Sequence, residues 1–115
     1  MFLIVLVVND PYLCHDLLRA WKEAGVPGGT IIESIGLQRA LNHALSDSLP
    51  LMPTLGNIEK SEETRNRTIF SVVRDQETVD RVKAATEEIL GSFKKEDTGF
   101  MFVVPVNQTF GMGWN

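Results

Sequence analysis

The chain of 115 residues carries one structural pattern twice. Val7 to Asp10 (VVND) closes a first apolar run, and Val72 to Asp75 (VVRD) closes a second one. Each run is followed by a helical pattern that stops at a glycine, Gly25 in the first half and Gly91 in the second. A second strand-like run then follows each helix. The repeat therefore predicts two β-α-β units within a single domain.

Both predicted helices have clear end signals. Asp10 can cap the first helix, Pro11 suits its first position, and Gly25 suits the left-handed residue that ends it. Asp75 and Gly91 serve the second helix in the same way. Residues on the expected inner stripes recur at helical spacing: Leu13, Leu17, Ala20, Trp21 and Ala24 in the first helix, and Val79, Val82, Thr86, Ile89 and Leu90 in the second.

Four runs rich in β-branched residues are predicted as strands. They are Phe2 to Val8, Thr30 to Ser34, Ile69 to Val73 and Phe100 to Val106. Two β-α-β units joined in this order predict an α+β fold, the ferredoxin-like β-α-β-β-α-β sandwich. Its two helices cover one face of a four-stranded antiparallel sheet.

The first predicted strand is apolar on both faces, whereas the helices of this fold can cover only one of them. The other face then presents an apolar patch larger than monomers usually expose. Self-association through the bare face is the simplest solution, and a long loop folded over it is the alternative.

Composition narrows the possible partners. The net charge of -4 makes nucleic acid an unexpected partner, because phosphate binding needs a basic face. Cys14 is the sole cysteine, which excludes a disulfide or a zinc site of several cysteines within one chain. The apolar start, Met1 to Val8, lacks the basic flank and cleavage site of a signal peptide and is too short to span a membrane. We expect a cytoplasmic protein without membrane insertion.

A long insert, about 37–68, separates the second and third predicted strands, where the minimal fold needs only a short hairpin. Loops of this length inside a compact domain are usually functional or partly disordered. Contact with a ligand or a partner protein is one interpretation of the insert, and a lid over the bare sheet face is the other.

The order of motifs resembles the nitrogen-regulatory PII signalling proteins and their PII-like relatives. The resemblance covers most of the chain. It is carried by the opening strand and its Pro-started helix, by residues 24–30 (AGVPGGT), by residues 33–36 (ESIG), by residues 98–106 (TGFMFVVPV), and by the position of the insert.

The resemblance implies a homotrimer with its sheets facing inward and a long loop that contacts a partner protein. It also implies an adenine-nucleotide site in the cleft between subunits. By position, the residues of that site are Gly36, Leu37 and Gln38 at the start of the loop, Asp97, Thr98 and Gly99 before the last strand, and Gly28, Gly29 and Thr30 of a neighbour.

The chain departs from the family pattern where the family binds phosphate. Phe100 stands where PII proteins have a basic residue, and no Lys or Arg follows Lys95. The loop also lacks the tyrosine that some members modify, since Tyr12 is the only tyrosine. These departures indicate a divergent, PII-like sensor of a small effector. Arg39, and Arg65 or Arg67, are candidates for the missing positive charge.

Other interpretations compete with this one. The segment Gly28 to Thr30 either presents backbone N–H groups to an anion or is a simple tight turn. A trimer like the CutA divalent-cation tolerance proteins, structural or metal-binding and without nucleotide, is the alternative function. We do not expect an enzyme: an acylphosphatase-like site needs an arginine after the first strand, where this chain has Asn9, Asp10 and Pro11.

Overall fold

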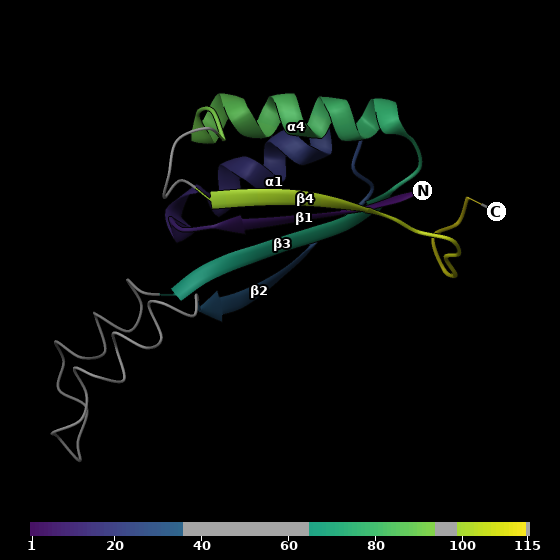
Figure 1. The fold of residues 1–115 in the computed structure, drawn as a ribbon, viewed down its shortest axis with the longest axis horizontal. Coiled ribbons are helices and arrows are strands. Elements are labelled where there is room, and N and C mark those ends of the chain that lie inside the picture. The colour runs from purple at the N-terminus through teal and green to yellow at the C-terminus, as the bar shows by residue number, and fades with distance from the viewer. Residues whose placement is uncertain (36–64, 94–98, 115) are drawn as a thin grey trace, which may run out of the picture.

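The computed structural model describes residues 1–35, 65–93 and 99–114. These residues form one four-stranded antiparallel sheet in the order β2-β3-β1-β4, with both helices on one side of it (Figure 1). The strands are β1 (Phe2–Val8), β2 (Thr30–Ile35), β3 (Arg65–Val73) and β4 (Gly99–Pro105). The helices are the 3-10 turn η1 (Pro11–Leu13), α1 (Cys14–Glu23) and α4 (Gln76–Leu90). The predicted α+β ferredoxin-like arrangement is confirmed.

The first helix starts differently from the prediction. Asp10 caps a single 3-10 turn, in which its carboxylate accepts a hydrogen bond from the backbone N–H of Tyr12 at 3.0 Å. Pro11 begins that turn, and the α-helix follows only at Cys14. The second helix begins as predicted, because Asp75 accepts a hydrogen bond from the N–H of Thr78 at 2.9 Å.

The third strand begins at Arg65, four residues before the predicted start at Ile69. Its added residues pair with β2 in register, so that Arg67 lies opposite Glu33 and Thr68 opposite Ile32. The boundary of the insert at 68 was therefore wrong, since the last residues assigned to it belong to β3. Residues 36–64 lie outside the described part of the chain.

Side chains on the helix side of the sheet form the core. Strand residues alternate between the two faces, and the register places Ile4 beside Ser71 and Leu6 beside Ile69 on the helix side. Leu17 and Trp21 of α1 pack against them. The most deeply buried apolar side chains are Ile4, Leu6, Val8, Leu17, Trp21, Ile69, Val73 and Val82.

None of the described helices covers the opposite face of the sheet, which we call the open face (Figure 1). Residues that pair across neighbouring strands point to the same face of the sheet. The register therefore places rows of mostly apolar side chains, which cross the sheet from strand to strand, on the open face. Phe100, Ile32, Phe102 and Val104 are 57%, 49%, 45% and 41% exposed. The apolar residues of the open face are Leu3, Val5, Val7, Ile32, Phe70, Val72, Phe100, Phe102 and Val104.

The segment after β4 turns back across the end of the sheet. The N–H of Val106 donates to the carbonyl of Met1 at 3.0 Å, and the guanidinium of Arg74 lies 5.6 Å from the ring centroid of Trp114. Among the described residues, no helix combines the length and the apolar character needed to cross a membrane.

Candidate functional site

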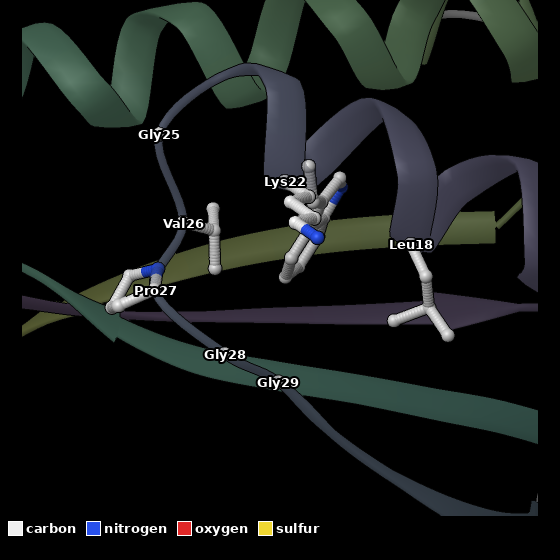
Figure 2. A pocket seen from close by; sticks show the side chains of 8 residues that line it. Leu18, Lys22, Gly25, Val26, Pro27, Gly28 and Gly29 are labelled. Carbon is white, nitrogen blue, oxygen red and sulfur yellow. The ribbon is translucent and has the colours of Figure 1, made fainter.

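A half-open groove of about 600 Å³ lies between the end of α1 and the segment that leads into β2 (Figure 2). Its walls are mostly apolar, and two glycines form the side nearest the sheet edge. A cavity of this size with few polar groups is the usual form of a ligand site. It is lined by Leu18, Trp21, Lys22, Gly25, Val26, Pro27, Gly28 and Gly29.

The turn that ends α1 creates this groove. The N–H of Val26 donates to the carbonyl of Trp21 at 3.0 Å, and the N–H of Gly25 donates to that of Lys22 at 3.1 Å. This pair of bonds is the Schellman ending of a helix, which needs a left-handed residue, and Gly25 supplies it with φ +105°. The chain then leaves the helix axis sharply, and the glycines after it have no side chains to fill the space.

Neighbouring elements hold the groove walls in place. Arg81 of α4 donates from Nε to the carbonyl of Ala24 at 2.9 Å, and it forms a salt bridge with Glu77 at 3.0 Å. The hydroxyl of Ser71 in β3 donates to the carbonyl of Gly28. Lys22 is the only charged residue among those that line the groove. Its ammonium group has no salt bridge to any residue that the structure describes.

A second polar cluster lies at the other end of β2. Arg67 forms a salt bridge with Glu33 at 3.2 Å, and its buried Nη1 has no hydrogen-bond partner among the residues that the structure describes. Burial raises the pKa of the Cys14 thiol; the positive charge of Arg67 counters this increase, and the carboxylate of Asp10 adds to it. A thiol with a raised pKa is poorly nucleophilic, which fits a structural cysteine.

The structure separates the sequence-predicted site residues that it describes. Gly28, Gly29 and Thr30 lie at the start of β2, where Thr30 pairs with Phe70. Gly99 pairs with Val8 at the far end of the sheet, about 14 Å away across three strand spacings and about 10 Å along the strands. One chain therefore does not bring the two segments together. Gly36, Leu37, Gln38, Arg39, Asp97 and Thr98 lie outside the described residues.

Gly99 has a structural role where it stands. Its φ of +135° is a backbone conformation that side chains disfavour, and a Cβ there would collide with the carbonyl oxygen of Val7. The sequence did not reveal this close approach, because it depends on the pairing of β4 with β1.

Sequence reasoning assigned Trp21 to the core and gave Leu18, Lys22, Val26 and Pro27 no role in a site. The structure places all five on the groove. The available signal was the helix-ending Gly25 followed within four residues by Pro27, Gly28 and Gly29. Such a sequence leaves a bulky helix face next to a chain segment with little side-chain volume.

The described residues contain no group of three or more His, Cys, Asp or Glu side chains that could hold a metal ion. No protein-family model matches the chain, and a search of curated proteins finds no match either.

Proposed function

We propose that the chain is a PII-like regulatory protein that forms a homotrimer through its open face. The observation that carries this proposal is the open face itself. Its four most exposed apolar side chains come from the two edge strands, and the rings of Phe100 and Phe102 stack with centroids 6.3 Å apart. These side chains are already about half buried, so covering the rest of each one contributes roughly half of a full burial, about 1 kcal/mol, and a second and a third copy are favourable partners.

In this proposal the trimer is cytoplasmic and senses a small effector between subunits. Gly29 and Gly99 lie far apart within one chain, so a site that contains both needs two chains. Assembly would bring these candidate site residues together. An adenine nucleotide is the first effector to test. The long loop would pass the signal to a partner protein, and no reaction is catalysed.

Light scattering coupled to size-exclusion chromatography tests the assembly. We expect the mass of three chains, each of 12.8 kDa, at micromolar concentration. A stable monomer under these conditions would contradict the trimer.

Isothermal titration calorimetry tests the effector. Titration of the trimer with ATP, ADP, AMP and cyclic dinucleotides is expected to identify one binder, and Arg39→Ala is expected to weaken it. If a trimer forms but no nucleotide binds, the adenine-nucleotide part is wrong. Binding of a divalent cation by that trimer would instead favour the CutA-like alternative.

A further inference from the structure

The groove at the end of α1 has walls that contacts within the chain already hold in place. The helix-ending bonds of α1 fix one wall, Arg81 of α4 donates to the carbonyl of Ala24, and Ser71 of β3 donates to that of Gly28 at the sheet edge. A preorganised site binds with a smaller entropic cost than a site that its ligand must order. The groove, of about 600 Å³, is therefore suited to a small molecule.

Among the described residues, the side chains that line the groove offer a ligand a single polar group. Trp21 has one side-chain N–H, and this group already donates to Thr86 at 2.9 Å. The other lining residues are glycine, proline or aliphatic, apart from Lys22, which is exposed in the last turn of α1. Because none of these side chains carries a hydrogen-bond acceptor, an anionic ligand complements the groove better than a cationic one.

The rest of the groove is apolar and open at its centre. Figure 2 shows the side chains of Leu18 and Lys22 extending from α1 toward the segment that carries Gly28 and Gly29. A Cβ on Gly29 would lie 3.9 Å from Leu18 Cδ2, so the glycine faces this leucine without a side chain between them. The space between the helix and the sheet edge can therefore hold an apolar group within reach of Lys22.

From this combination we infer that the groove binds a small organic monocarboxylate. Its carboxylate contacts the ammonium group of Lys22, and its apolar body, a ring or a short hydrocarbon chain, lies between Leu18 and Gly29. Every residue of this site belongs to one chain, so the inference rests neither on the trimer nor on nucleotide binding.

NMR titration of the isotope-labelled full chain tests the inference directly. The probes are hydrocinnamate and octanoate, which distinguish a ring from a chain, and the neutral amide of each. We expect at least one carboxylate to shift the backbone amide signals of Val26 and Gly29 and to saturate at submillimolar concentration. Its amide should bind about fivefold more weakly, because it forms no ion pair. No binding of either carboxylate, or shifts confined to β4 on the open face, would overturn the proposal.

Two variants of Lys22 separate its charge from its apolar stem. Lys22→Met retains the stem and removes the charge, so we expect it to bind the acid and the amide with equal affinity. Lys22→Glu should reverse the preference, so that the cation phenylpropylamine binds more tightly than hydrocinnamate. A preference for the acid that persists in Lys22→Met would overturn the contact with the ammonium group.

A leucine placed inside the groove tests the position of the ligand. Gly29→Leu fills the space next to Leu18 and is expected to abolish binding. Ala84→Leu adds a leucine at an exposed position of α4, outside the groove, and should leave the affinity unchanged. Equal affinities of the two variants would overturn the assignment. If Gly29→Leu does not fold, the comparison of acid and amide on the wild-type chain still decides, because equal binding of the two contradicts the inference.

Discussion

The indole of Trp21 shows how one residue ties the two helices together. Its Nε1 donates to the hydroxyl of Thr86 at 2.9 Å, and that hydroxyl donates to the carbonyl of Val82 at 2.7 Å. Trp21 and Thr86 are both buried. A hydroxyl can accept and donate at once, so Thr86 satisfies a buried donor that an apolar side chain would leave unpaired.

Replacing Thr86 with valine keeps the volume and removes the acceptor. We expect Thr86→Val to lower the free energy of unfolding by about 1–3 kcal/mol, because the indole N–H then stays buried without a partner. Urea denaturation measures the change. The double variant with Trp21→Phe should lose less than the sum of the two single changes, and strict additivity would mean that the bond contributes nothing.

The sequence placed Trp21 and Thr86 on the inner stripes of their helices, and their burial confirms both positions. Helical periodicity indicates which face a residue occupies within its own element. It does not identify a partner 65 residues away, which depends on how the two helices cross. Thr86 therefore appeared as one more stripe position, and its hydrogen bond emerged only from the packing.

At the scale of elements, the start of α4 responds to pH. The hydroxyl and the backbone N–H of Thr78 both donate to Asp75, at 2.7 Å and 2.9 Å, and they lower the pKa of this carboxyl below its ordinary value of 3.8. A lowered folded-state pKa means that the ionised cap stabilises the fold above pH 3.8. This contribution is lost as the pH falls through the folded-state pKa.

We therefore expect Asp75→Ala to lower the melting temperature at pH 7 and to have a smaller effect near pH 2.5. Circular dichroism melts at both pH values measure the difference. Glu88→Ala, an exposed change in the same helix, is the control and should have little effect at either pH. A loss of stability that is equal at pH 7 and pH 2.5 would contradict the role of the ionised cap.

The entry into β4 depends on Gly99. We expect Gly99→Ala to destabilise the fold by about 1–3 kcal/mol, because the methyl group both strains the backbone and meets the Val7 carbonyl. Gly28→Ala, with open space around its Cβ, should change stability little. Chemical denaturation compares the two, and similar losses would indicate a general effect of lost glycine flexibility.

Strand boundaries were harder to predict than strand existence, and β3 shows why. Residues Arg65 to Thr68 are polar and do not resemble a buried strand. They become one because β2 lies beside them: Arg67 pairs with Glu33, and the hydroxyls of Thr68 and Ser34 lie 2.8 Å apart. The pattern of apolar residues in one segment does not show that a neighbouring strand will supply polar contacts to it.

At the scale of the molecule, the first strand predicted a sheet that is apolar on both faces. The structure confirms that the helices cover one face. Among the described residues, no helix packs on the open face, and its apolar side chains stay partly exposed. The groove was not predicted as a whole because it forms between elements. Its glycines were singled out from the sequence, but the depth beside them depends on the angle at which α1 ends.

A charge on the open face should break the proposed trimer. We expect Phe102→Asp to convert it to monomer, since a buried carboxylate without a partner is strongly unfavourable at an interface. Tyr12→Asp, which changes an aromatic side chain that is 90% exposed on η1, should leave the mass unchanged. Light scattering measures both variants, and circular dichroism verifies that each is folded. A trimer of Phe102→Asp would place the contact elsewhere.

The central position of β1 has a consequence for synthesis on the ribosome. Phe2 pairs with Val73 on one side and with Pro105 on the other. Of the four strands, β1 is thus made first, and one of its edges stays unsatisfied until β4 has been made. Because synthesis runs from the N-terminus, a nascent segment with two apolar faces keeps an unpaired edge through that interval. We expect nascent chains that end before β4 to bind chaperones that hold exposed apolar segments, and chains that include β4 to be released from them.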